Sequence, residues 1–230
     1  MEVYELVLKV FLLKSIESSN ALEKISEIID KTLAKDEKFL DFHDANKFKY
    51  YSYTSFFPIE KDKIYREGRI YSIKIRALRK DLVEYLKKNL VNEYTEHVKS
   101  LTLEYKIINK KHIEKIYSIT PVIMKTNKGY WKGNLSLTEF ERRTKENLIK
   151  KYNDYFNTKI DEDFELFRMI KFENNKPISC LYKNIKILGD KLTINIAENS
   201  TAQELTYFAL GAGILEMNSR GYGFVNYKWI

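Results

Sequence analysis

The order of strand-like and helix-like patterns along the first half of the chain constrains its fold more than any other feature of the sequence. Apolar residues that alternate with a period of two indicate a half-buried strand, whereas apolar residues three or four positions apart indicate one face of a helix. Strand patterns span residues 4–12, 50–57, 69–78 and 101–105, and helix patterns span residues 20–33 and 81–90. Their order is β-α-β-β-α-β, which predicts the ferredoxin-like motif of a four-stranded antiparallel sheet with two helices on one face.

The second half of the chain repeats this order. We expect strands at 117–125, 164–172, 181–196 and 223–227, the third of them folded at the Gly189-Asp190 turn. Capping boxes that begin with Ser136 and Ser200 open two helices between these strands. The sequence thus predicts an α+β protein of two tandem ferredoxin-like (RRM-like) β-α-β-β-α-β domains, residues 1–118 and 119–230. No low-complexity linker separates them, so we expect them to pack together.

The net charge and the single cysteine restrict the kinds of partner and the cellular compartment that we expect for this protein. The formal charge of +8 suits a polyanion, but lysine that accumulates in AT-rich genomes would give the same charge without any partner. Cys180 is the only cysteine, which excludes an intrachain disulfide and cysteine-rich zinc sites and predicts a reducing cytoplasm. No apolar run approaches the roughly 20 residues of a membrane helix. The segment from Val3 to Leu13 lacks the marks of an export signal, so we expect no membrane partner.

The most specific motif lies near the C-terminus, where residues 211–225 read Gly-Ala-Gly-Ile-Leu-Glu-Met-Asn-Ser-Arg-Gly-Tyr-Gly-Phe-Val. Four of the eight glycines lie in this segment: Gly211, Gly213, Gly221 and Gly223. Such a loop can hold an RNA phosphate on its backbone amides or pack tightly under one, and it can equally be ordinary punctuation at a helix end and a bend. A dinucleotide-binding fingerprint follows a strand and opens a helix, whereas this segment follows a helix and leads into a strand. A Rossmann site is therefore disfavoured.

This glycine-rich segment resembles the C-terminal loop of RAMP-type CRISPR proteins, in particular the endoribonucleases that process CRISPR repeat RNA. Residues 119–123, residues 148–152 and the doubled layout are also similar to that family, so the resemblance covers nearly the whole chain. It implies a cytoplasmic prokaryotic enzyme of antiviral defence that cuts repeat RNA in precursor transcripts into guide RNAs, with no cofactor. A homodimer and association with subunits of a CRISPR effector complex are left open.

His43 and Lys49 are the candidate catalytic residues. Imidazole suits proton transfer near neutral pH, and the chain has three histidines. In the family that the chain resembles, the catalytic histidine lies between the first helix and the second strand and is followed by a lysine, a place that His43 and Lys49 match. Lys47 competes with Lys49 for that role. His97 and His112 have no motif around them, and we expect them to be solvated.

The resemblance implies attack of a ribose 2′-hydroxyl on the adjacent phosphate, which leaves 2′,3′-cyclic phosphate and 5′-hydroxyl ends. His43 would act as general base or as general acid, and Lys49 would stabilise the developing negative charge. We expect no metal, because the histidines and the cysteine lack the short spacings of zinc ligands. Family members often carry a tyrosine on the first helix that completes a triad, but residues 20–34 contain none. Ser26 and Lys31 are candidates to substitute for it.

The resemblance also implies that RNA lies in the groove between the halves and against a C-terminal hairpin. The candidate RNA-binding residues are Gly211, Gly213, Arg220, Gly221, Gly223, Lys125, Lys183, Lys186 and Lys191. Lys128, Trp131 and Lys132 add groups that could contact phosphate or stack on a base, although a solvated face would explain each lysine equally. The alternative function is a non-catalytic RAMP-type RNA-binding subunit of an effector complex. An enzyme would cut repeat RNA in EDTA, and a binding subunit would leave it intact.

Overall fold

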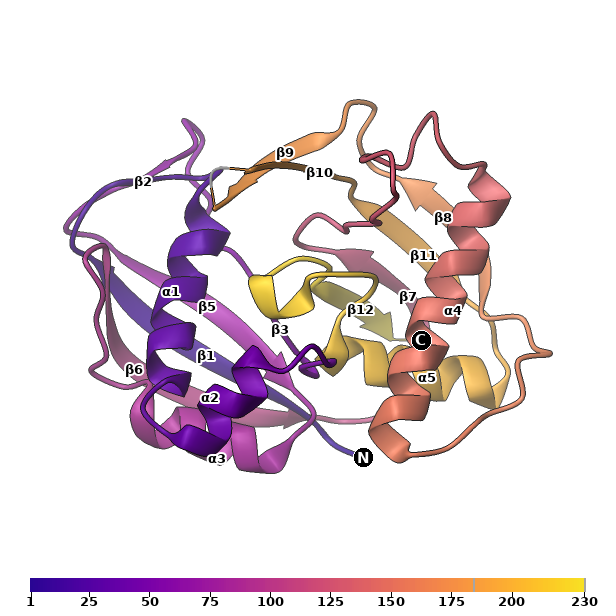
Figure 1. Ribbon diagram of the computed structural model, residues 1–230, viewed down its shortest axis with the longest axis horizontal. Coiled ribbons are helices and arrows are strands. Elements are labelled where there is room, and N and C mark those ends of the chain that lie inside the picture. Colours follow the sequence, from indigo (N-terminus) through magenta and orange to yellow (C-terminus); the bar gives the residue numbers. More distant parts are fainter. Residues whose placement is uncertain (184, 230) are drawn as a thin grey trace.

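The first half of the chain forms the four-stranded antiparallel sheet that its sequence predicts. The computed structural model describes residues 1–183 and 185–229. The sheet order is β3-β5-β1-β6, and α1 and α3 pack against it (Figure 1). The elements of this half are β1 (Val3–Leu12), β2 (Ile16–Glu17), α1 (Ala21–Leu33), α2 (Glu37–Asp44), β3 (Tyr51–Tyr53), β4 (Ile64–Tyr65), β5 (Ile70–Ala77), α3 (Lys80–Asn89) and β6 (Val98–Ile108).

The second half forms a sheet of the same topology. Its order is β12-β7-β11-β8, so that in both sheets the first strand of the half lies between its third and fourth strands. The elements are β7 (Ile113–Ser118), α4 (Leu137–Phe156), β8 (Phe167–Phe172), β9 (Ile178–Tyr182), β10 (Ile185–Gly189), β11 (Leu192–Ile196), α5 (Ser200–Ala212), η1 (Asn218–Arg220) and β12 (Val225–Trp229). The predicted α+β fold of two tandem ferredoxin-like halves is confirmed by this order of elements and strands.

Two predicted strands of the second half are wrong in detail. The expected strand at 117–125 is β7, which ends at Ser118. The expected strand at 181–196, which includes residue 184 outside the described residues, is divided between two sheets. β10 pairs with β9, whereas β11 pairs with β7 and β8, so Gly189 and Asp190 do not form a hairpin turn. The alternating apolar pattern is present in both strands, and only tertiary contacts decide that they separate.

The β9–β10 hairpin leaves the second sheet and packs on the first half. Cys180 belongs to the apolar core of the first half, with Ile178 and Ile187 packed against it. The backbone N–H of Leu181 donates to the carbonyl of Ser19 over 3.2 Å. In Figure 1 the hairpin reaches across the top of the molecule towards α1. It therefore ties the two halves together at one end.

The two halves also share core residues and are joined by hydrogen bonds from a buried arginine of the first half. Val3 and Leu78 pack into the core of the second half. The side chain of Leu78 lies so close to Gly211 that a Cβ at this glycine would have no room. The Arg76 guanidinium, 1% exposed, donates to the Glu5 carboxylate over 2.8 Å and to the carbonyl of Val225 over 2.6 Å. These contacts confirm that the halves pack together.

A short connection leads from the first sheet to the second. The first sheet ends at Ile108 and the second begins at Ile113. We propose that the boundary between the halves lies in this connection rather than after residue 118. None of the helices in the described part of the chain is long and apolar enough to cross a membrane.

Candidate active site

The short helix α2, which no sequence pattern predicted, carries His43. The Asp36 carboxylate caps its N-terminus by accepting from the N–H of Phe39 over 3.3 Å. The Phe39 ring is buried and stacks on Tyr85 of α3 with centroids 4.1 Å apart. Residues four positions apart lie on one face of a helix, so this anchor directs His43 towards the body of the first half.

The imidazole of His43 lies between an acidic and a basic side chain. Its Nδ1 is 3.4 Å from Asp30 Oδ1 on α1, and its Nε2 is 3.4 Å from Arg220 Nη2. A guanidinium only donates, so where this contact is a hydrogen bond Nε2 is the acceptor, and a neutral ring then carries its proton on Nδ1, on the side of Asp30. Asp30 Oδ1 is buried and has no hydrogen-bond partner among the described residues, so the approach of Nδ1 to it is a close contact and not a formed hydrogen bond. The side chain of His43 remains 19% exposed, so the ring can be reached from solvent.

Arg220 joins the C-terminal loop to this site. It ends η1, and its Nη1 donates to the hydroxyl of Ser26 over 2.9 Å and to the carboxylate of Asp30. Burial opposes the charge of Arg220, but Asp30 together with Tyr182 and Tyr51 more than offsets this, and the pKa of Arg220 is raised. The sequence predicted Arg220 only as an RNA-binding residue, and the structure brings it to the candidate catalytic histidine. Ser26, considered as a substitute for the missing tyrosine, contacts Arg220, whereas Lys31 pairs with Glu93.

Lys49 closes the C-terminal end of α2. Its ammonium donates to the carbonyls of Phe42 and Ala45, the latter over 2.5 Å. Burial, and then the charge of Arg220, lower the pKa of Lys49. A cation at a helix C-terminus satisfies carbonyls that have no partner within the helix. Lys49 therefore fixes the helix that presents His43, whereas the competitor Lys47 is exposed and has no side-chain hydrogen bond among the described residues.

The four glycines of the C-terminal segment are buried, and their backbone is used inside the protein. The amides of Gly213, Gly221 and Gly223 donate to the carbonyls of Ala209, Asn218 and Pro121 over 2.8–2.9 Å. Gly223 has a φ of +68°, and a Cβ there would collide with the carbonyl of Ile214. The geometry therefore favours tight packing over phosphate capture by these three amides.

Lys151 of α4, which the sequence analysis missed, holds this loop from inside the second half. Its Nζ donates to the carbonyls of Gly213 and Leu215 over 3.2 and 2.5 Å and to Asn218 Oδ1 over 2.6 Å. The residue is 3% exposed, and burial lowers its pKa to about 7, while Glu216 acts in the opposite direction. A lysine three residues after Leu148, on the apolar face of the predicted helix, was the signal that could have identified it.

The remaining predicted residues are dispersed. Lys183 and Lys186 are exposed on the β9–β10 hairpin, while Lys191 precedes β11 outside it. Trp131 is buried and donates to the Asp190 carboxylate over 2.7 Å, so it is no open stacking surface. Lys132 pairs with the same carboxylate over 3.0 Å, whereas Lys128 is exposed. His112 is exposed as expected, but His97 is half-buried, because its Nδ1 is covered by neighbouring residues.

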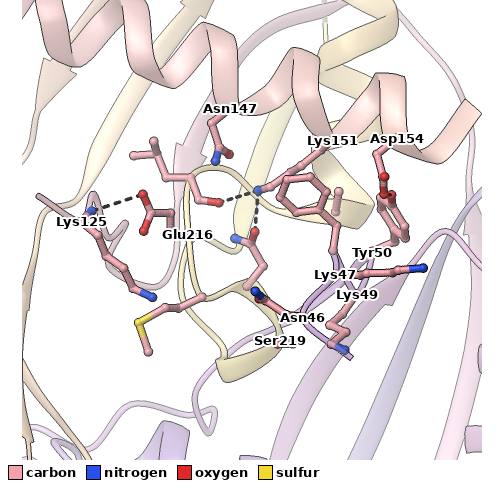
Figure 2. Close-up of a pocket in the computed structure, with 15 residues that line it drawn as sticks. Asn46, Lys47, Lys49, Tyr50, Lys125, Asn147, Lys151, Asp154, Glu216 and Ser219 are labelled. Atoms are coloured by element: carbon pink, nitrogen blue, oxygen red, sulfur yellow. Dashed lines mark hydrogen bonds between the residues drawn. The ribbon is translucent and has the colours of Figure 1, made fainter. Parts of the chain in front are cut away.

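We call His43, Asp30 and Arg220 together the histidine cluster. A pocket of about 430 Å³ opens next to this cluster, and we call it the central pocket (Figure 2). Residues 46–50 form one wall, α4 contributes Asn147, Lys151 and Asp154, and residues 215–219 with Lys125 complete the lining. Lys125 is the one predicted RNA-binding lysine in this lining. In the described part of the chain, no group of three or more His, Cys, Asp or Glu side chains is placed to hold a metal ion.

Comparison with known proteins identifies relatives among the CRISPR-associated proteins. The family model for the C-terminal part of the CRISPR-associated protein Cas6 matches residues 103–227, which is more than half of the chain. The CRISPR-associated endoribonuclease Cas6 2 of Methanocaldococcus jannaschii is 22% identical over 213 residues, covering 85% of this chain and 87% of that protein.

Solved structures share the fold over nearly the full length. A RAMP protein described as binding different RNA substrates has a TM-score of 0.71 at 17% identity and covers 98% of this chain and 99% of its own. A CRISPR-associated protein Cas6 has a TM-score of 0.70 at 19% identity, and the match covers 99% of this chain and 100% of that protein. A Cas6-related protein from Pyrococcus furiosus has a TM-score of 0.71 at 16% identity, with 98% of each chain covered.

Proposed function

We propose, from the premise that this chain belongs to the Cas6 family of CRISPR-associated proteins, that it is an endoribonuclease that cuts CRISPR repeat RNA in precursor transcripts. The observation that carries the proposal is the imidazole of His43 held between Asp30 and Arg220 at the junction of the two halves. The relative from Methanocaldococcus jannaschii is described as an endoribonuclease, which supports the same activity here.

The proposed reaction is a transesterification within the RNA that needs no metal. The 2′-oxygen forms a bond to phosphorus, the bond from phosphorus to the 5′-oxygen breaks, and the products carry 2′,3′-cyclic phosphate and 5′-hydroxyl ends. His43 removes the 2′-hydroxyl proton with the lone pair of Nε2, and the departing 5′-oxygen takes a proton from solvent. The proposed base has its ring proton on Nδ1 and a free lone pair on Nε2, and the donor that Arg220 directs at Nε2 supports this form.

Arg220 and Lys49 are the proposed positive charges around the transition state. The guanidinium of Arg220 lies within 3.4 Å of the ring nitrogen that would face the ribose, so a phosphate bound there would replace His43 as its partner. Lys49 holds the end of α2, and its charge adds to the positive potential around the phosphate. Asp30 keeps the ring in one orientation and stabilises the imidazolium that forms.

The RNA is proposed to follow the junction between the halves. Lys125 would meet it in the central pocket, and Lys183 and Lys186 would meet it on the β9–β10 hairpin. Lys191 is a candidate for a more distant contact. Gly211, Gly213, Gly221 and Gly223 act by packing the loop that presents Arg220, which makes their contribution to RNA binding indirect.

The alternative is a non-catalytic RNA-binding subunit of a CRISPR effector complex. The solved RAMP protein described as binding different RNA substrates keeps this alternative in view, because its fold is the same. The arrangement around His43 favours the enzyme, since a binding subunit has no need for an imidazole placed between a carboxylate and an arginine.

The deciding experiment is cleavage of the repeat RNA in EDTA by the wild-type protein and by His43→Ala, with RNA binding measured in parallel. We expect single-site cutting with cyclic-phosphate ends, and a loss of about 10²–10⁴-fold in rate in the variant with binding kept. His112→Ala, at an exposed histidine, is the matched control and should cut normally. Binding without cutting by the wild type would establish the alternative, and cutting only with added metal would refute the proposed chemistry.

A further inference from the structure

We propose that the central pocket binds one unpaired nucleotide of the RNA beside the scissile phosphate and selects a base that carries an exocyclic amino group. This inference rests on the proposed ribonuclease function and identifies which feature of the substrate the site reads. The volume of about 430 Å³ lies within the roughly 300–1,000 Å³ of small-ligand sites, and a single nucleotide is a ligand of that class.

The pocket adjoins the histidine cluster through both of its long walls. Ser219, in one wall, directly precedes Arg220, whose guanidinium contacts His43. Lys49, in the other wall, is bonded to the last carbonyls of the helix that carries His43. A nucleotide in the pocket is therefore a close neighbour of the phosphate that the cluster would attack.

Two residues that line the pocket carry hydrogen-bond acceptors without strong partners. Asn147 points from α4 towards the space in Figure 2, and its Oδ1 is buried with no hydrogen bond among the described residues. The carboxylate of Glu216 accepts only the backbone N–H of Lys125, over 3.3 Å, within the same part of the chain. An unpaired buried acceptor costs free energy that a donating ligand recovers.

These acceptors fit the amino groups of adenine, guanine and cytosine. An asparagine amide pairs with the N6 and N7 edge of adenine, and a carboxylate accepts from the N4 amino group of cytosine. Uracil has a single N3–H donor between two carbonyl oxygens, so it can satisfy only one of the two acceptors and has a carbonyl oxygen where the other bases carry an amino group. Unpaired bases in RNA expose these edges, whereas an A-form helix keeps them inside a deep, narrow groove.

The charges around the pocket suit a chain that passes through it. Lys47 and Lys125 come from different halves and lie at opposite sides of the pocket in Figure 2. Neither ammonium makes an ion pair within the described residues, so both are available to the phosphates on either side of the bound nucleotide. Lys151 and Lys49 are instead engaged with backbone carbonyls, which keeps the walls of the pocket in place.

The test is a series of repeat RNAs cut under single-turnover conditions in EDTA. Each of the two nucleotides on either side of the cut is changed to uridine or to an analogue without the amino group, purine riboside for adenosine and inosine for guanosine. At one of these positions we expect the wild type to cut roughly tenfold more slowly. Asn147→Leu should lose this discrimination, whereas Lys125→Ala should slow the cutting of all RNAs alike.

The controls use residues of the same types outside the pocket. Asn109→Leu and Lys150→Ala change exposed residues, and both should keep the wild-type pattern. If Asn147→Leu does not fold, Glu216→Gln supplies the same test, with reduced discrimination expected. Base changes without effect at all these positions, or discrimination kept in both pocket variants, would overturn the inference. Loss of all cutting by the wild type would instead reject the proposed function.

Discussion

Two basic side chains hold the C-terminal loop from opposite sides, and their surroundings differ. Lys151 is 3% exposed and donates to three oxygen atoms of the loop. The side chain of Arg220 is 21% exposed and contacts Asp30, Ser26 and His43. The inner cation has no open side, whereas the outer one can still receive a ligand. The comparison teaches that Lys151 fixes the loop from inside while Arg220 stays at the surface beside His43.

Arg220→Ala tests the outer cation and has the largest expected effect. We expect the rate of cutting to fall about 10²-fold or more, because a positioned donor to the transition state is lost. The measurement is single-turnover cleavage of the repeat RNA, with binding measured alongside. Arg220→Lys should recover part of the rate, since it keeps the charge but loses the planar pair of donors. An unchanged rate in Arg220→Ala would show that the outer cation has no catalytic role.

Lys151→Met tests the inner cation. The substitution keeps most of the volume but leaves three buried acceptors without a donor, so we expect the free energy of unfolding to fall by about 2 kcal/mol. For a chain of this length that lowers Tm by about 4–8 °C. Thermal unfolding measures it, and Lys150→Met, one residue earlier on α4, is the exposed control. An undiminished Tm would show that these bonds do not hold the loop.

Asp30→Asn separates orientation from charge at His43. An amide can donate to Nδ1 and so favour the wrong tautomer, and we expect cutting to slow about tenfold. The variant also removes the negative charge beside the ring, so we expect the rate to fall while RNA binding is kept. Asp30→Glu is the conservative control. An unchanged rate with a lowered Tm would assign Asp30 a structural role only.

The smallest expected effect is the pH dependence of stability that the buried Lys151 causes. Burial lowers the pKa of Lys151 to about 7 in the folded protein, from the 10.5 that applies when the chain is unfolded. Between these values the unfolded chain binds more protons, so this residue makes the folded state more stable as pH rises, by at most about 1.4 kcal/mol per pH unit. From pH 7 to 9, wild type should gain stability relative to Lys151→Met. Parallel unfolding curves would contradict the burial of this charge.

The fold was largely readable from the sequence because its main signals are local. The period of apolar residues marked β1, α1, β5 and α3, and Ser136 does cap α4 as predicted, by accepting from the N–H of Glu139 over 3.1 Å. The split between β10 and β11 was not readable. Both strands alternate in the same way, and the choice depends on contacts of Cys180 with the distant first half.

The candidate site was readable only in part. His43 and Lys49 carried a local spacing, and Arg220 lay in a conspicuous motif, so all three were found as separate residues. Asp30 looked like any polar residue of an amphipathic helix, and Lys151 like one of many lysines. Their importance arises from partners as far away in the sequence as residues 213–220, which no short pattern records.

The sequence by itself determined the repeated β-α-β-β-α-β order, because strands and helices differ in the period at which they bury apolar side chains. It also determined which chemical groups are present, a single motif-bearing imidazole and a glycine-rich segment. Only the tertiary structure decided that Arg220 meets His43, that Lys151 lies buried beneath the loop, and that a pocket opens between the halves. The physical reason is that hydrogen bonding, burial and pocket shape depend on residues brought together from both halves of the chain.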